Sequence, residues 1–187
     1  DWAWIQNMLA SAADNDGGRV GVVIDNGCLF RGGKEKIIRA RILEADLIEG
    51  IIVLPEKLFY NTGAPGAIIV LNKNKQKNRK GKVLFINASN EYEQHPDVRK
   101  LNTLAKHNIE KIAKAYQDYR EEKGFSRVVL LDEIKRNDYN LNVSLYAFPE
   151  EEAEHIDIEK EWQGLKQLEQ EEHEIDKKIE VFLKEIE

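Results

Sequence analysis

Apolar positions recur along the chain at two different spacings, and the spacing changes several times before residue 90. Residues 1–13 hold apolar side chains three and four positions apart, which predicts an amphipathic helix. Residues 19–25 form a nearly continuous β-branched run, typical of a strand buried on both faces, as in a parallel sheet. A second helix is expected at 33–44. Its apolar face would hold Ile37, Ile38, Ile42 and Leu43.

Three further apolar runs predict three more strands, at 48–54, 67–71 and 83–88. The loop before the second of them is rich in aromatic and turn residues, and the loop before the third is strongly basic. Strands that alternate early with helices favour a layered α/β sheet.

The second half of the chain reads mainly as helix. Residues 97–123 carry an apolar stripe and predict one long helix, with Gly124 as its C-cap. Residues 128–131 and 143–147 are short strand candidates. Beyond Glu150 the apolar positions predict the seam of a coiled coil or helical hairpin. That seam comprises Ile158, Trp162, Leu165, Leu168, Ile175, Ile179, Phe182 and Ile186.

Charge is unevenly distributed over the chain. Residues 150–187 carry 15 acidic residues and 5 lysines, a net charge of −10, whereas the whole chain has −6 and residues 1–149 therefore about +4. An acidic tail on a mildly basic body indicates two surfaces with different partners. We expect three segments, at 1–95, 96–148 and 149–187.

The composition argues against several classes of protein. Cys28 is the only cysteine, so an intramolecular disulfide is impossible, which fits a cytoplasmic location, and we expect this thiol to be buried among apolar residues. A membrane span is not expected, because the chain lacks a run of eighteen apolar residues. The histidines lack ligand-type spacing, so no metal site is predicted. Neither a phosphate-binding loop nor a Ser/His/Asp set can be assigned.

Short motifs in a fixed order run through the first 147 residues. They are Asn26–Gly33, Leu54–Gly63, Ala67–Lys73, Lys82–Ala88, Asp132–Ile134 and Asn137–Asn142. As an ordered set they resemble the modification subunit of type I restriction–modification systems, a family of N6-adenine DNA methyltransferases.

The resemblance implies an α/β fold, the C-terminal half of a Rossmann-like sheet of the S-adenosylmethionine-dependent methyltransferases, followed by a long helix and a helical tail. Residues 19–25 would be the fifth strand of that sheet, 48–54 the sixth and 67–71 the antiparallel seventh. Without its earlier strands, residues 19–25 would form an open edge, so we expect the chain to dimerise or to pair with another strand there.

Two hallmarks of the family do not occur in these 187 residues: the glycine-rich loop that binds S-adenosylmethionine, and the catalytic Asn-Pro-Pro-aromatic motif. We expect both upstream of Asp1, since the chain begins inside a helical pattern without an initiator methionine. S-adenosylmethionine is then the cofactor of the parent enzyme. This chain alone would bind no cofactor, contain no catalytic residue and be inactive.

The resemblance also points to a binding site for an extruded adenine. Phe59 matches the aromatic residue that stacks on the base in related adenine methylases, and Tyr60 is the alternative. Phe59 as a core residue is an equally open interpretation. Asn26, Gly27 and Asn61 are candidates to line the pocket, although turn chemistry alone explains them.

The basic loop is a candidate for DNA-phosphate contact through Lys73, Lys75, Lys77, Arg79 and Lys80. A solvated loop between two strands is the alternative. In the family the C-terminal region helps to join the specificity subunit, so the tail is a candidate interface. Folding of the tail back onto the body is the alternative.

The expected partners are therefore DNA and a specificity subunit, with a nuclease subunit as a further candidate, and no membrane. A non-catalytic interaction module with a coiled-coil arm is the alternative function.

Overall fold

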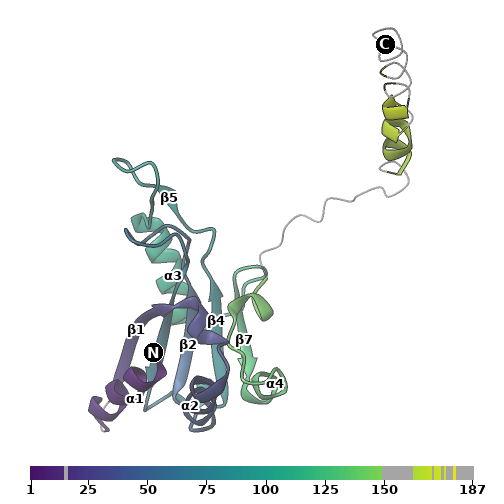
Figure 1. Ribbon diagram of the computed structural model, residues 1–187. Helices are drawn as coiled ribbons and strands as arrows, with labels where there is room; N and C mark the ends of the chain where they lie inside the picture. Colours follow the sequence, from purple (N-terminus) through teal and green to yellow (C-terminus); the bar gives the residue numbers. More distant parts are fainter. Residues whose placement is uncertain (15–16, 149–161, 170, 174, 176–178, 180–187) are drawn as a thin grey trace. The chain divides into compact units, whose positions relative to one another are not determined.

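The computed structural model describes residues 1–14, 17–148, 162–169, 171–173, 175 and 179. The chain divides into two compact units, Asp1–Pro149 and Glu150–Glu187 (Figure 1). The larger unit contains every element discussed below except the tail helix.

A five-stranded mixed sheet forms the centre of the larger unit. In chain order its strands are β1 (Arg19–Asp25), β2 (Ile48–Val53), β3 (Gly66–Asn72), β4 (Lys82–Asn87) and β7 (Ser126–Leu130). Their spatial order is β1-β3-β2-β4-β7. Strands β2 and β4 are parallel, β3 is antiparallel to both of its neighbours, and β7 is antiparallel to β4. The strands expected at 48–54, 67–71, 83–88 and 128–131 are confirmed, and 67–71 is antiparallel as expected.

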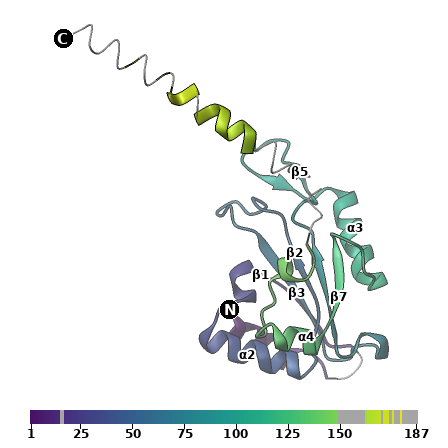
Figure 2. The ribbon, with the colours of Figure 1, turned by 90° about the vertical axis from the view of Figure 1, so that its right-hand side faces the viewer.

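Helices cover both faces of the sheet, as Figure 2 shows. Helices α1 (Trp2–Ser11), α2 (Gly33–Glu44) and α4 (Leu131–Arg136) contribute to the larger apolar cluster on one face. Helix α3 (Lys106–Asp118) packs on the other face, through Ile112 and Ala115. The mixed α/β class expected from the sequence is therefore confirmed.

Strand β1 is less buried than its sequence indicates. Among the described residues its only partner is β3, and its side chains alternate between exposed and partly buried. Val23, for example, is 54% exposed. The prediction of burial on both faces is wrong because an apolar run cannot reveal whether a strand is central or at an edge. The expectation of an open edge at 19–25 is confirmed.

The single helix expected at 97–123 does not form. Residues 93–103 instead make a two-stranded hairpin, β5 (Glu93–Gln94) with β6 (Asn102–Thr103), and α3 begins only at Lys106. Helix α3 ends at Asp118, followed by Tyr119 in the left-handed conformation, so Gly124 is not its cap. Leu101 keeps the helical spacing but is buried as the anchor of the hairpin, with an exposed fraction of 9%.

Two other local predictions are corrected. Residues 143–145 form a short 3-10 turn rather than a strand, and α4 was not anticipated. On α2 the side chain of Ile37 is exposed, whereas that of Arg39 is 1% exposed. Arg39 tolerates burial because its guanidinium donates to the carbonyl oxygens of Cys28, Arg31 and Tyr139.

In the smaller unit, residues 162–169 and 171–173 are helical, as expected. The described apolar positions of the predicted seam are all exposed: Trp162, Leu165, Leu168, Ile175 and Ile179. Ile158, Phe182 and Ile186 lie outside the described residues.

A buried carboxylate ties the basic loop to α3. Glu49 is at a β-bulge in β2 and is fully buried. Its oxygens accept hydrogen bonds from Asn72 (3.0 Å), Arg79 (3.1 Å) and Tyr116 (2.6 Å). Burial would raise the pKa of Glu49, but these three donors outweigh it and hold the pKa below its usual value. Glu49 therefore stays ionised inside the fold.

We predict that Arg79→Ala destabilises the protein by about 3–5 kcal/mol, because it leaves the buried charge of Glu49 without its cation. Arg19→Ala is the matched control: Arg19 lies 4.0 Å from the same carboxylate, but its side chain is half exposed. The control should cost about 0–1 kcal/mol. Urea unfolding at neutral pH measures both free energies, and equal losses would contradict the network's role.

Candidate functional site

Strands β1, β2 and β4 all end at the same end of the sheet, which we call the carboxyl end. Asp25 of β1 lies opposite Gly66, the first residue of β3, and Val53 of β2 lies beside Asn87 of β4. Ligands of α/β sheets bind outside the carboxyl ends of strands. The loops after β1, β2 and β4 are therefore the first place to look for a site.

Phe59 lies in the loop between β2 and β3, at the carboxyl end. Its backbone bridges to Thr62, whose N–H donates to the Phe59 carbonyl (3.4 Å). The ring packs so closely on Gly66 that a Cβ at that position would lie 2.8 Å from Cε2 of Phe59. The side chain is nevertheless 36% exposed. Phe59 is thus a partly exposed ring supported from one side, rather than a core residue.

The ring also borders an apolar groove of about 470 Å³. The other walls of this groove are the free edge of β1, at Val22 and Val23, and the exposed face of α1, at Trp4 and Met8. Tyr60 does not line the groove; its side chain is 80% exposed.

The other candidate pocket residues are close to the same end of the sheet. Asn26 and Gly27 begin a 3-10 turn (Asn26–Leu29) directly after β1. The amide oxygen of Asn26 is buried and, among the described residues, has no hydrogen-bond partner. Asn61 lies exposed in the Phe59 loop. The structure brings these three residues to one end of the sheet, and their role as a pocket lining stays a prediction.

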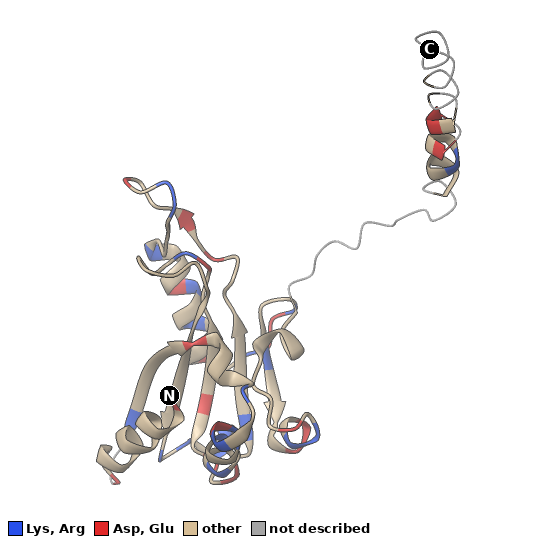
Figure 3. Ribbon diagram, in the orientation of Figure 1, with Lys and Arg blue, Asp and Glu red and all other residues tan. Residues whose placement is uncertain are grey.

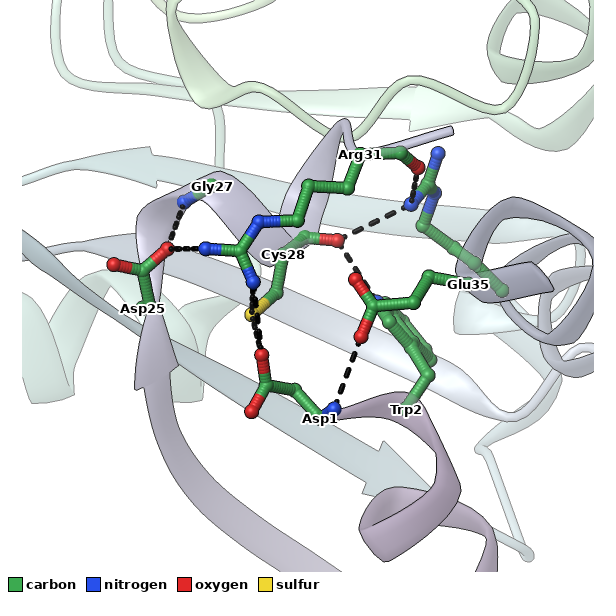
Figure 4. Close-up of polar contacts among 8 residues, drawn as sticks. Asp1, Trp2, Asp25, Gly27, Cys28, Arg31 and Glu35 are labelled. Atoms are coloured by element: carbon green, nitrogen blue, oxygen red, sulfur yellow. Dashed lines mark hydrogen bonds and ion pairs between the residues drawn. The ribbon is translucent and has the colours of Figure 1, made fainter. Parts of the chain in front are cut away.

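Polar contacts fix the turn after β1 against α1 and α2 (Figure 4). Arg31 bridges the carboxylates of Asp25 (2.9 Å) and Asp1 (3.0 Å). Cys28 Sγ donates to Asp1 (2.8 Å), and its carbonyl accepts from Trp2 Nε1. Cys28 is fully buried, as expected, and burial raises the pKa of its thiol. Cys28 is therefore a buried residue that is held in the turn by packing and by its hydrogen bond to Asp1.

The basic loop lies at the other end of the sheet. Strand β3 runs from Gly66 beside Asp25 to Asn72 beside Arg19, so the loop 73–81 is separated from the carboxyl end by seven residues of strand. At a rise of 3.3 Å per residue, that is about 20 Å.

Three of the five candidate phosphate ligands in this loop already have protein partners. Lys73 contacts Asp14 (2.6 Å), and Arg79 contacts Glu49. Lys75 is 4% exposed and contacts Asp46 (2.6 Å); burial lowers its pKa, which the Asp46 carboxylate partly offsets. Lys77 and Lys80 are exposed. These positions favour a structural interpretation for Lys75 and Arg79, and leave phosphate contact as a prediction for the exposed members.

The β5–β6 hairpin also lies at the carboxyl end, and the sequence pattern did not predict it. Asn102 in β6 donates from its backbone N–H to the carbonyl of Lys57 and from Nδ2 to that of Glu56, both at 2.9 Å. The hairpin is therefore fastened to the loop that carries Phe59. The backbone contacts of Asn102 are not encoded in any periodicity, which explains why pattern reasoning missed them.

The described part of the chain lacks two kinds of feature. No group of three or more His, Cys, Asp or Glu side chains there could hold a metal ion. No helix there is long and apolar enough to cross a membrane.

Comparison with known proteins identifies the family. The sequence profile of the N-6 DNA Methylase family matches residues 1–155. The chain is 59% identical over 94% of its length to the type I restriction enzyme MjaVII methylase subunit of Methanocaldococcus jannaschii, and 53% identical over 100% to the MjaVIII methylase subunit of the same organism. It spans 30% and 32% of those relatives.

A solved structure agrees with these matches. The crystal structure of the type I restriction–modification system methyltransferase subunit from Streptococcus thermophilus superposes with a TM-score of 0.71 at 34% identity. The alignment covers 79% of this chain and 30% of that subunit. The chain belongs to the N-6 DNA methylase family, and its relatives are methylase subunits of type I restriction enzymes.

Proposed function

We propose that this chain is one part of an adenine-specific DNA methyltransferase, which transfers a methyl group from S-adenosylmethionine to N6 of adenine within a type I restriction–modification complex. The observation that carries the proposal is the match to the N-6 DNA Methylase family over residues 1–155. The chain spans about a third of its relatives, so other segments supply the remaining parts. We call the complete protein the assembled methyltransferase.

Strand order supports a Rossmann-like methyltransferase sheet. β3 is inserted antiparallel between β1 and β2, so that β1 and β2 run in the same direction. The antiparallel direction of β3 is the one that the resemblance implies for the seventh strand. β1 would then be the position at which the sheet continues into the rest of the enzyme.

The residues of this chain do not by themselves suit S-adenosylmethionine. The groove at the carboxyl end is walled mainly by apolar side chains such as Val22, Met8 and Trp4, and it follows the free edge of a strand. A cofactor with charged amino-acid and sulfonium groups requires polar partners. The cofactor site and the catalytic group therefore belong to other segments of the assembled methyltransferase.

The contribution of this chain is to hold the target base. A methyltransferase must extrude a base from the duplex, and stacking on an aromatic ring is worth roughly 1–3 kcal/mol. Phe59 has the required position: an exposed ring at the carboxyl end, supported from behind by Gly66. Tyr60 is the alternative stacking residue, and Asn26, Gly27 and Asn61 would border the base.

Two surfaces are proposed for subunit contacts. The tail helix presents exposed apolar side chains at Trp162, Leu165 and Leu168, which a helix buries only against a partner. We assign this surface to the specificity subunit, and a nuclease subunit would join the same complex. The cell compartment would be the cytoplasm.

The second surface, the free edge of β1, is available only when the chain is alone, since the sheet would continue there in the assembled methyltransferase. Lys73 N–H donates to the Gly18 carbonyl (3.0 Å), so residues of even number turn their backbone groups toward β3. Arg19, Gly21, Val23 and Asp25 therefore present theirs to the outside. A second copy of the chain could pair its β1 antiparallel to this one, with the two Val22 residues opposite each other. Arg19 of each copy would then lie opposite Asp25 of the other. Paired charges favour this register when the chain is alone.

For base stacking, we predict that Phe59→Ala in the assembled methyltransferase reduces extrusion of a target 2-aminopurine by about 5- to 150-fold, the equivalent of about 1–3 kcal/mol. Tyr60→Ala, the adjacent aromatic substitution, should have little effect. Fluorescence of 2-aminopurine measures extrusion. Unchanged fluorescence with Phe59→Ala would exclude the stacking role, and a loss confined to Tyr60→Ala would transfer it to Tyr60.

For the strand edge, we predict that the chain alone self-associates at micromolar concentration, and that Val23→Lys reduces this because it places a charge on the pairing edge. Ile37→Lys is the control, since both side chains are 54% exposed and β-branched. Size-exclusion chromatography with light scattering gives the mass. A monomeric unaltered chain, or equal effects of the two substitutions, would rule out pairing through β1.

A further inference from the structure

If Phe59 holds a base of the DNA, the next question is which cationic side chains bind the DNA phosphates near it. The basic loop lies at the opposite end of the sheet, about 20 Å along β3 from Gly66, on which the Phe59 ring packs. A protein that holds one extruded base at the carboxyl end needs phosphate contacts near that end, because phosphate contacts fix the register of the protein on the duplex.

Cations near the carboxyl end differ from those of the basic loop in their partners. Lys57, Arg99 and Lys100 are exposed, and none of them forms an ion pair with a described residue. In the basic loop, by contrast, Lys75 and Arg79 are buried against carboxylates. Free cations can exchange counterions for DNA phosphates without first breaking a protein contact.

Arg99 and Lys100 lie in the hairpin loop that joins β5 to β6, and this loop has a defined structure. His95 Nδ1 accepts hydrogen bonds from the N–H groups of Asp97 and Val98, both at 3.2 Å. The Leu101 carbonyl accepts from His95 N–H at 3.0 Å. Figure 1 shows the hairpin extending beyond the end of the sheet, and Figure 3 shows basic residues along it.

The hairpin and the Phe59 loop are joined through Lys57. The carbonyl of Lys57 accepts from Asn102 in β6 (2.9 Å), and its N–H donates to the carbonyl of Gly63 (3.3 Å), which closes the Phe59 loop. One residue thus links the loop of the ring that would stack on a base to the hairpin that carries Arg99 and Lys100. Relative movement of the hairpin and the ring would break these hydrogen bonds.

The acidic residues of the same segments only partly offset this charge. Glu91 is paired with Lys111, and Glu93 lies 3.8 Å from Nε2 of His107. Glu56 and Asp97 remain without a cation among the described residues. When His107 is protonated, three free cations face two free carboxylates; when it is neutral, Glu93 is a third carboxylate and the charges balance. A contact here therefore depends on the position of individual side chains rather than on a large positive field.

We propose that the β5–β6 hairpin is a DNA-backbone contact, in which Arg99 and Lys100, with Lys57 at its base, bind phosphates beside the extruded adenine. This rests on the proposed function. The basic loop then stabilises the fold and leaves the carboxyl end to the nucleic acid. Because phosphate contacts carry no sequence information, the hairpin contributes affinity and register but not target choice.

The test is the salt dependence of DNA binding by the assembled methyltransferase. We expect Arg99→Gln combined with Lys100→Gln to lower the slope of log K against log salt by about 2, because each lost phosphate contact removes about 0.9. The loss should be equal on target and non-target duplexes. The charge-preserving pair Arg99→Lys with Lys100→Arg should keep the slope.

Lys77→Gln combined with Lys80→Gln is the charge-matched control. It removes the same charge from the two exposed lysines of the basic loop, whose phosphate contact is the competing prediction. If the hairpin rather than the basic loop binds the phosphates, the control leaves the slope unchanged. A slope lowered only by the control would overturn the proposal in favour of the basic loop. An unchanged slope with weaker subunit assembly in the hairpin variant would make the hairpin a protein interface and overturn it too.

The outcomes for the two proposals can be told apart. If Phe59→Ala reduces 2-aminopurine fluorescence while the hairpin variant keeps its slope, base stacking stands and the hairpin contact falls. If the unaltered assembled methyltransferase does not bind DNA, both fall. Thermal melting of each variant confirms that the folds are comparable, as expected for exposed side chains.

Discussion

The reversed direction of β3 is the constraint on which the rest of the structure depends. β3 lies between β1 and β2 and runs antiparallel to both. The loop before it is therefore at the carboxyl end and the loop after it is at the other end. Phe59 and Lys73, the first residue of the basic loop, are 14 positions apart in the sequence and are separated by the full length of β3. A ligand group that contacts Phe59 therefore cannot also contact the basic loop.

The two ends of the sheet differ in how their polar groups are used. At the end with the basic loop, Glu49 and Asp46 hold Arg79 and Lys75 inside the fold, and this stabilises the junction of β2, α3 and the loop. At the carboxyl end, Asn102 holds the hairpin to the Phe59 loop through the backbone carbonyls of Glu56 and Lys57, while the side chains of Phe59 and Arg99 stay exposed. These hydrogen bonds fix the position of the surface and leave those two side chains free, which suits a surface that meets a ligand.

Much of the fold was predictable because it is recorded in short-range periodicity. The β-branched runs of β1 to β4 and the spacing in α1 and α2 identified those elements with small boundary errors. Prediction failed where a long-range contact decided the outcome. Residues 97–104 have helical spacing, yet Asn102 binds the backbone at Glu56 and Lys57, and the segment becomes a hairpin. Its charge makes Arg39 look like a surface residue in the sequence. In the structure its guanidinium is buried and donates hydrogen bonds to three carbonyl oxygens. The family motif placed Phe59 at the carboxyl end, whereas nothing local distinguished the paired cation Lys75 from the exposed cation Lys77.

The central claim is that DNA lies against the carboxyl end of the sheet. Photo-crosslinking tests it directly, with benzoylphenylalanine introduced in place of Tyr60 beside Phe59, or in place of Asn78 in the basic loop, in the assembled methyltransferase bound to a target duplex. Both positions are exposed, so the label should not disturb the fold. The account predicts crosslinks to DNA from position 60 and none from position 78. Crosslinks from position 78 alone would contradict it.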